Sequence, residues 1–190
     1  MVLPVGQSWL AGEGDSRGRP GPARCQDPPA LHRHRRRAHH GRPDLWPEPG
    51  HTKAFHVRDG AATKWLQRAG IPVAFISGLD AAATRYRAED LGVVDCFAGH
   101  LDKLPVLEQL CAKYGLAYDQ VAHLGDDLPD LPLLSRVGLA CCPSDAAPEV
   151  KDVCHWVTEV PGGLGLLRLV AERILKAQGR WADTVGKYGG

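Results

Sequence analysis

The sequence lacks the features that mark several large classes of protein. It contains no run of the roughly 18 apolar residues that a membrane-spanning helix needs. Its first ten residues are only mildly apolar and are followed by glycine and charged residues, so they do not predict a secretory signal peptide. None of the six cysteines belongs to a C-x-x-C pair, which argues against zinc. We therefore expect a cytoplasmic protein with no membrane partner and with reduced thiols in its core.

The net charge is also low, at +1 over 190 residues, but the charged residues are unevenly distributed. Residues 1–50 carry eight arginines, no lysine and five acidic residues, which gives +3 and leaves −2 for the remainder. Residues 31–40 form a basic block, L-H-R-H-R-R-R-A-H-H. The block lacks the interleaved aromatic residues or recognisable fold of a nucleic-acid-binding domain, so we expect no nucleic-acid partner.

The first 50 residues differ in composition from the rest. They hold eight of the 15 prolines and four of the nine histidines, and they show neither helical nor strand periodicity. This composition predicts a disordered basic segment over 1–50 that contains no strand for a sheet. We expect one domain over 51–180 and a flexible tail over 181–190.

From residue 52 onward, short apolar runs alternate with helical patterns. The expected strands are 72–76, 93–97, 121–124, 138–141 and 155–158. The expected helices are 59–69, 81–91, 103–114, 128–136, 147–152 and 164–178, the last with Leu167, Val170, Ala171, Ile174 and Leu175 facing inward. Strands alternating with helices predict an α/β fold, a Rossmann-like, mostly parallel sheet flanked by helices.

The strongest chemical signal is G-D-D-L-P-D-L at 125–131, directly after the apolar run 121–124. Ligands of open α/β sheets bind at the carboxyl ends of the strands. Clustered carboxylates at such a place suit Mg²⁺, which prefers oxygen ligands. Asp126, Asp127 and Asp130 are therefore candidates for a metal site, and capping of the following helix is the alternative for each.

Seven segments together resemble one family of phosphatases. They are K-A-F-H-V-R-D-G (53–60), F-I-S-G (75–78), D-K (102–103), G-D-D-L-P-D-L (125–131), D-A-A-P-E-V (145–150), P-G-G-L-G (161–165) and I-L-K-A-Q-G (174–179). In this order they are similar to the 3-deoxy-D-manno-octulosonate 8-phosphate phosphatase family of the haloacid dehalogenase-like hydrolases. The resemblance covers about residues 51–180.

The resemblance implies a haloacid dehalogenase-like fold and a Mg²⁺-dependent phosphatase that is usually a homotetramer. Its substrate would be 3-deoxy-D-manno-octulosonate 8-phosphate, a sugar-acid phosphate of lipopolysaccharide biosynthesis. The reaction would pass through an aspartyl-phosphate on an aspartate nucleophile. A non-catalytic binding or assembly subunit, and a phosphatase for nine-carbon sialic-type 9-phosphates, are the alternative functions.

The same resemblance assigns roles to individual residues. Asp126 is the Mg²⁺ ligand, and Asp127 and Asp130 either support the site or cap the helix. Ser77 binds the transferring phosphoryl group, with ordinary turn chemistry as the alternative. Lys103 offsets the charge on the phosphoryl oxygens, with a solvated lysine at a helix start as the alternative.

Substrate binding is implied for the loop His56, Val57, Arg58, Asp59 and Gly60, and for Lys64, Arg87 and Lys103. Arg58 could instead pair with Asp59, and Lys64 and Arg87 could be exposed helix cations. The sequence departs from the family at Leu79, where an arginine is usual, and at Leu164, where a basic residue is frequent. Both departures reduce positive charge near an anionic substrate. His123 is expected to be a packed core residue, and the tryptophans to be structural.

The family's nucleophile motif, D-x-D-G-V, is absent. Aligned without gaps, its aspartates fall on Arg33 and Arg35, and arginine can neither attack phosphorus nor bind Mg²⁺. Read one base later, codons for residues 31–39 can encode F-I-D-I-D-G-V-L-T. We therefore predict that residues up to about Gly50 are out of frame, that this chain has little activity, and that it folds poorly without a central first strand. A divergent basic tail is the alternative.

Overall fold

A six-stranded sheet runs through the described part of the chain, which in this computed structural model is residues 2–4, 44–45 and 53–189. In spatial order its strands are β5 (Asp95–Ala98), β4 (Ala74–Ser77), β1 (Val2–Pro4), β6 (Val121–Leu124), β7 (Leu139–Cys142) and β8 (Trp156–Val157). The pairs β4–β5, β6–β7 and β7–β8 are parallel. A separate antiparallel pair joins β2 (Asp44–Leu45) to β3 (Lys53–Ala54). The expectation of a mostly parallel α/β sheet is confirmed.

Helices occupy the connections between the strands. They are α1 (Val57–Arg68), α2 (Ala82–Leu91), α3 (Leu104–Tyr114), α4 (Leu131–Leu134), α5 (Pro148–Val153), α6 (Leu166–Ala177) and α7 (Trp181–Gly186), with 3-10 turns at Tyr118–Gln120 and Leu128–Asp130. Between residues 59 and 178, the ends of the expected elements differ from the observed ones by at most two residues. The one change of type is at 128–136, where Pro129 and Pro132 lack backbone donors and a 3-10 turn precedes one turn of α4.

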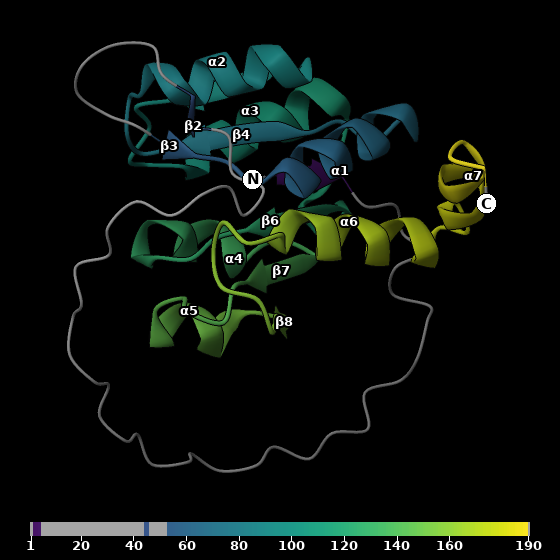
Figure 1. Cartoon of the computed structure of the whole chain (residues 1–190). Coiled ribbons are helices and arrows are strands. Elements are labelled where there is room, and N and C mark those ends of the chain that lie inside the picture. The colour runs from purple at the N-terminus through teal and green to yellow at the C-terminus, as the bar shows by residue number, and fades with distance from the viewer. Residues whose placement is uncertain (1, 5–43, 46–52, 190) are drawn as a thin grey trace, which may run out of the picture.

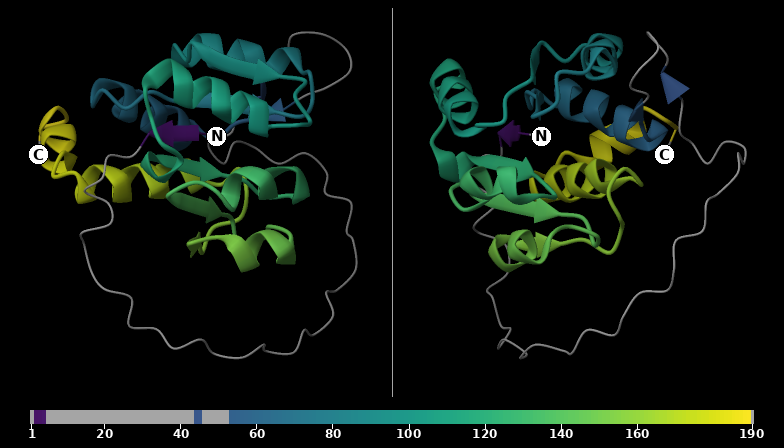
Figure 2. Two further views of the ribbon diagram at one scale, coloured as in Figure 1. Left: turned by 180° about the vertical axis from the view of Figure 1, so that it is seen from behind. Right: turned by 90° about the vertical axis from the view of Figure 1, so that its left-hand side faces the viewer.

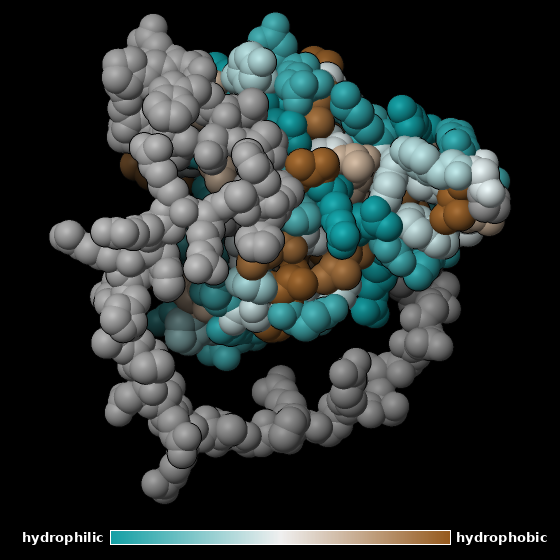
Figure 3. Space-filling model, in the orientation of Figure 1, coloured by the Kyte–Doolittle hydropathy of each residue, from teal (hydrophilic) through white to brown (hydrophobic). Residues whose placement is uncertain are grey.

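The helices cover both faces of the sheet (Figure 1). Helices α1 and α6 lie side by side and share one hydrophobic core with β6 and β7. Helices α3, α4 and α5 form a second core on the other face. The α6 stripe is buried as expected, at Leu167, Val170, Ala171, Ile174 and Leu175. Figure 3 shows that hydrophilic residues cover most of the described surface of one face, with apolar residues gathered in the region of α6.

Strand β1 corrects the expectation that the first 50 residues contain no strand. It lies in the centre of the sheet, between β4 and β6, and runs antiparallel to both (Figure 2). Three of its residues face β6, from Val2 opposite His123 to Pro4 opposite Val121. Only Val2 has a partner on β4, at Ala74. The apolar run V-L-P is too short to show periodicity, and its place depends on pairing with strands far along the chain.

The sheet is therefore not split at its centre, although we expected the chain to lack a central first strand. The other expectations for residues 1–50, including the disordered segment and the basic block at 31–40, lie outside the described residues, apart from β2. The amino end of β1 points toward the edge where the parallel strands have their carboxyl ends, because β1 runs in the opposite direction, and Val2 lies opposite Ala74 at the start of β4.

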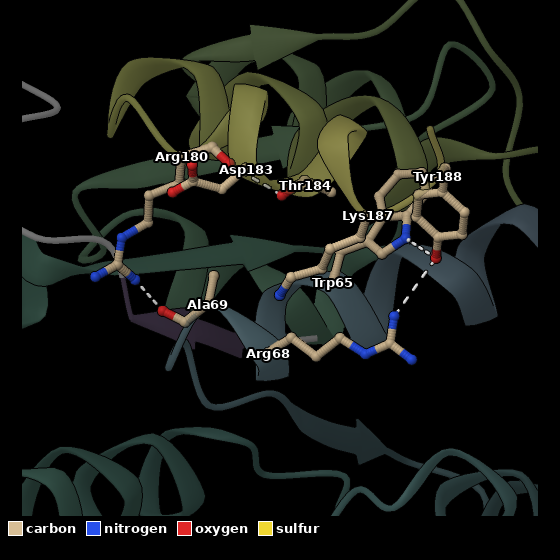
Figure 4. Close-up of a pocket in the computed structure, with 8 residues that line it drawn as sticks. All are labelled: Trp65, Arg68, Ala69, Arg180, Asp183, Thr184, Lys187 and Tyr188. Atoms are coloured by element: carbon tan, nitrogen blue, oxygen red, sulfur yellow. Dashed lines mark hydrogen bonds between the residues drawn. The ribbon is translucent and has the colours of Figure 1, made fainter. Parts of the chain in front are cut away.

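Helix α7 corrects the expectation of a flexible tail over 181–190. It packs beside the carboxyl-terminal half of α1, where the Trp65 and Trp181 rings meet edge to face with centroids 5.7 Å apart. The indole N–H of Trp65 donates to the Tyr188 hydroxyl at 2.9 Å (Figure 4). The Arg168 guanidinium lies over the Trp65 ring, 4.0 Å from its centroid. Contacts of Trp181 and Tyr188 with the buried Trp65 ring order a segment whose own helical pattern is weak.

Two further findings concern the cysteines and the membrane. Cys96, Cys111, Cys141, Cys142 and Cys154 are free thiols, and three of them are buried, in agreement with the expected reduced core cysteines. Among the described residues, no helix is both long enough and apolar enough to span a bilayer.

Candidate functional site

The carboxylate cluster after β6 divides into residues with different roles. Asp127 caps the 3-10 turn, because its Oδ1 accepts a hydrogen bond from the backbone N–H of Leu128 at 2.8 Å. Asp126 does not make that bond. Its backbone N–H points to Oδ2 of Asp130 at 3.4 Å, and its residue remains exposed. Asp127 therefore caps the 3-10 turn, and the Asp126 carboxylate at the strand end is not used for capping.

Asp130 joins two side chains in the interior. Its Oδ1 accepts a hydrogen bond from Lys103 Nζ at 2.7 Å and lies 2.8 Å from His123 Nε2. Lys103 is only 9% exposed, Asp130 3% and His123 0%. The alternative of a solvated lysine is therefore wrong for Lys103. His123 is the core residue that we expected, and Asp130 acts as a support that holds Lys103 beside the Asp126 segment.

The pKa values of the titratable groups in this cluster shift in different directions. Burial alone would raise the pKa of the Asp130 carboxyl, but the hydrogen bonds from His123 and Lys103 hold it well below its ordinary value. Burial lowers the pKa of His123 from 6.5 to about 4. Lys103 already balances the negative charge of Asp130, so the neutral imidazole is the stable form. Desolvation, followed by the charge of Asp130, raises the pKa of the Asp126 carboxyl.

Ser77 is the last residue of β4. In the sheet, only β1 separates β4 from β6, the strand that precedes the carboxylate cluster. The Ser77 hydroxyl donates to the carbonyl oxygen of Leu79 at 2.9 Å, which is the turn chemistry that we gave as the alternative. Ser77 also lines a cavity of about 370 Å³. A hydroxyl can turn toward a phosphoryl oxygen when one is present, so both interpretations remain compatible with this geometry.

The same cavity brings together several residues of the expected substrate loop. Its lining includes His56, Asp59, Gly60 and Arg87. Asp59 Oδ1 accepts a hydrogen bond from the backbone N–H of Arg168 at 2.9 Å, which fixes the loop against the start of α6. Desolvation raises the pKa of the Asp59 carboxyl.

Arg87 is buried, so the alternative of an exposed helix cation is wrong for this residue. It pairs with Asp90 at 2.7 Å, and its guanidinium lies 5.7 Å from the centroid of the Phe55 ring. Gly60 permits this placement, because a β-carbon there would overlap the Arg87 guanidinium.

Other expected substrate residues lie outside the cavity. Val57, Arg58 and Lys64 are exposed and do not line it, and no ion pair joins Arg58 to Asp59 in the described structure. Leu79 and Leu164 are 49% and 43% exposed, so each presents an apolar side chain to solvent where a cation is usual.

Among the cavity residues that sequence reasoning missed are Lys53 and Thr84. Lys53 Nζ donates to Thr84 Oγ1 at 3.0 Å. Burial lowers the pKa of Lys53. Lys53 opens the segment K-A-F-H-V-R-D-G, so its position next to the substrate loop was a usable signal. Thr84 lies inside a helix pattern and gave none.

A metal site can be tested against the described residues. The Asp126 carboxylate has oxygen ligands of the kind that Mg²⁺ prefers. Its pKa is raised because its charged form is desolvated and lies near Asp130, and a nearby cation would stabilise that charged form. However, the described residues contain no group of three or more His, Cys, Asp or Glu side chains placed to hold a metal. They supply one carboxylate of a site and not a complete set of ligands.

A sequence model of the haloacid dehalogenase-like hydrolases matches residues 62–165. Over 134 residues, the chain is 39% identical to the 3-deoxy-D-manno-octulosonate 8-phosphate phosphatase of Yersinia pestis. That match covers 70% of this chain and 72% of the relative.

Solved structures resemble the fold at similar levels of identity. A probable phosphatase from Pseudomonas syringae aligns with a TM-score of 0.71 and 40% identity, over 78% of this chain and 85% of that one. A 3-deoxy-D-manno-octulosonate 8-phosphate phosphatase from Moraxella catarrhalis, solved with magnesium, phosphate and a KDO molecule, aligns with a TM-score of 0.70 and 31% identity. That alignment covers 77% of this chain and 84% of that one.

Proposed function

Because this chain belongs to the 3-deoxy-D-manno-octulosonate 8-phosphate phosphatase family of the haloacid dehalogenase-like hydrolases, we propose that its function is phosphomonoester hydrolysis. The substrate is 3-deoxy-D-manno-octulosonate 8-phosphate, and the products are the free acid sugar and phosphate, in lipopolysaccharide biosynthesis. One observation carries the proposal: a buried Lys103–Asp130 pair lies beside the Asp126 segment at the carboxyl edge of the sheet.

Three residues take part in the chemistry of phosphoryl transfer. Lys103 is held in place by Asp130 and offsets charge on the phosphoryl oxygens, which is the main catalytic requirement of this reaction. The Ser77 hydroxyl donates to one of these oxygens. Asp126 would supply one of the ligands of Mg²⁺, and the charge of the bound ion would offset the negative charge of the phosphate.

The acid sugar is bound by the residues around the cavity and by exposed cations next to it. His56, Asp59, Gly60 and Arg87 line the cavity, and Arg58 and Lys64 lie on the exposed side of the loop and of α1. The protein assembles as a homo-oligomer, a tetramer by its family. The phosphatase domain that we propose spans residues 51–180 and is completed by β1 and α7, and the compartment is the cytoplasm.

The chain as written is impaired in this function. It contains no D-x-D pair anywhere, so no side chain is available for the family's nucleophile motif. Arg33 and Arg35 take the places of the two aspartates in the ungapped alignment, and these positions lie outside the described residues. The frame error proposed above accounts for the loss. Sequencing the coding DNA across codons 1–55 tests it, and finding no single-base change that opens a D-x-D-G reading would refute it.

Activity is tested by comparing two forms of the protein. Phosphate release from 3-deoxy-D-manno-octulosonate 8-phosphate with Mg²⁺ is measured for the chain as written and for a form in which residues 31–39 read F-I-D-I-D-G-V-L-T. We expect turnover only from the second form, and its loss in that form on Asp126→Asn or Lys103→Met. Glu149→Gln, a surface change on α5, serves as the control. Normal turnover by the chain as written would refute the proposed impairment.

The alternatives give different results in the same assays. A sialic-type 9-phosphate turned over faster than the eight-carbon substrate would favour the second phosphatase. A Mg²⁺-dependent thermal shift with no turnover from either form would favour a binding subunit.

A further inference from the structure

Another pocket, of about 240 Å³, lies between the end of α1 and helix α7. Figure 4 shows the residues that line it, from Trp65 on α1 to Tyr188 just after α7. The candidate substrate loop is at the start of α1, so this pocket lies at the opposite end of a 12-residue helix. A helix of that length spans roughly 18 Å. The function proposed above makes no use of this pocket.

The lining of the pocket is cationic. Arg68, Arg180 and Lys187 contribute three positive charges, and Asp183 is the acidic side chain among the described residues that line it. The net charge of the lining is therefore about +2. None of these four side chains forms an ion pair within the described part of the chain. Three cations that share one concave surface attract an anion, because each adds its own Coulomb interaction with the bound charge.

The two guanidinium groups are held at the pocket but keep most of their donors unused. Arg180 donates to the carbonyl oxygen of Ala69, and Arg68 Nη1 lies 3.5 Å from the Tyr188 hydroxyl oxygen. In the view of Figure 4, the Lys187 side chain lies between these two contacts. A guanidinium has five N–H donors, so each arginine has several left for a ligand.

The Tyr188 hydroxyl supplies a further donor. Its oxygen accepts from the Trp65 indole N–H at 2.9 Å and faces the Arg68 guanidinium, and both of these groups are donors. The proton of the hydroxyl has no acceptor among the described residues. The hydrogen bond from Trp65, together with the hydrogen bond and charge of Arg68 and the charge of Lys187, lowers the pKa of this hydroxyl. The surroundings of the hydroxyl therefore favour negative charge.

We propose that the pocket between α1 and α7 binds the phosphate group of a small dianion. A phosphate monoester carries a charge of about −1.5 to −2 at pH 7, which complements the lining. Arginine guanidinium groups match phosphate oxygens with paired N–H donors. The volume of about 240 Å³ is below the roughly 300 Å³ at which drug-sized sites begin, so the ligand is compact. Free phosphate and a small phosphomonoester share this chemistry.

Binding is tested on the full chain by isothermal titration calorimetry, in EDTA and at constant ionic strength, with inorganic phosphate and with glycerol 3-phosphate as separate probes. We expect saturable binding with a dissociation constant of about 0.1–1 mM for at least one probe, and the tighter probe identifies the source of the phosphate group. The bound anion joins α7 to α1, so proteolysis at the carboxyl terminus should become slower. EDTA removes Mg²⁺ and no turnover is measured, so the result is independent of the proposed phosphatase function.

Variants locate the binding site. The Lys187 side chain makes no hydrogen bond or ion pair within the described structure, so Lys187→Gln should keep the fold and weaken binding about threefold to tenfold. Adding Arg68→Gln should weaken it further, to more than about tenfold in total. Asp183→Asn removes the opposing charge and should strengthen binding about threefold. Lys151→Gln on α5 removes the same charge elsewhere and should leave the affinity within about 1.5-fold.

Thermal unfolding without ligand checks that each variant is folded. The absence of saturable binding of either probe up to roughly 20 mM would overturn the proposal. Unchanged affinity in the folded Arg68→Gln/Lys187→Gln variant would also overturn it, because the anion would then bind elsewhere on the protein. A loss in Lys151→Gln equal to that in Lys187→Gln would reduce the effect to the net charge of the chain and would refute a defined site.

Discussion

The buried Lys103–Asp130 pair offers a sharp test of what holds the site together. Asp130→Ala removes a carboxylate that accepts bonds from Lys103 at 2.7 Å and from His123 at 2.8 Å. It leaves the Lys103 ammonium, 9% exposed, without a counter-charge. Removing one partner of a buried ion pair costs about 3–5 kcal/mol, because the remaining charge stays desolvated. We expect the free energy of unfolding to fall by that amount.

Two comparisons isolate the pair from the general effect of truncation. In Lys103→Met/Asp130→Ala, neither charge remains, so the double variant should lose less than the sum of the two single variants, with a coupling of about 2 kcal/mol or more. The exposed pair of Arg85 and Asp80 is the surface control, and Asp80→Ala should cost less than about 1 kcal/mol.

The assay is urea unfolding followed by circular dichroism at pH 7, with the slope of each transition checked for two-state behaviour. In thermal unfolding, the Asp130→Ala loss corresponds to a fall of roughly 6–20 °C for a chain of this size. If Asp130→Ala costs no more than Asp80→Ala, the buried pair does not carry the stability assigned to it.

Acidification gives an independent check on Asp130. Its folded pKa lies below the unfolded value, so its contribution to stability is present above pH of about 4 and is lost as the pH falls further. The wild-type protein should therefore lose stability below pH 4 more steeply than the Asp130→Asn variant does. Parallel pH curves for the two proteins would contradict the depressed pKa.

Three further predictions concern other parts of the molecule. His123 has a folded pKa of about 4 against 6.5 unfolded, so its contribution is complete above pH 6.5 and falls by roughly 3 kcal/mol toward pH 4; unfolding curves of wild type and His123→Gln over this range should diverge accordingly. Tyr188→Phe should cost about 1 kcal/mol and release α7, seen as faster proteolysis at the carboxyl terminus, because the Trp65 indole N–H loses its acceptor. Gly138→Ala should lower the thermal midpoint by several degrees, since its β-carbon would overlap the Asp119 carbonyl oxygen, whereas Gly186→Ala, which meets nothing, should not.

Local patterns in the sequence predicted most of the elements and one part of the site. The α6 stripe and the glycines that end α2 and α3 are readable because helix periodicity and left-handed termination depend on neighbouring residues alone. The aspartates after β6 were readable for the same reason. The sequence did not predict which aspartate makes which contact. The structure shows that Asp127 accepts from the Leu128 N–H and that Asp130 accepts from Lys103.

What the sequence determined by itself is the alternation of strands and helices, the carboxylates at a strand end, and the lack of a D-x-D pair. Only the tertiary structure decided that Val2–Pro4 enters the centre of the sheet, that α7 docks on Trp65, and that Lys103 and Arg87 are buried. The reason is the range of the interactions. Periodicity and capping act over a few residues, whereas strand pairing, aromatic packing and ion-pair burial join residues whose separation along the chain carries no local signal.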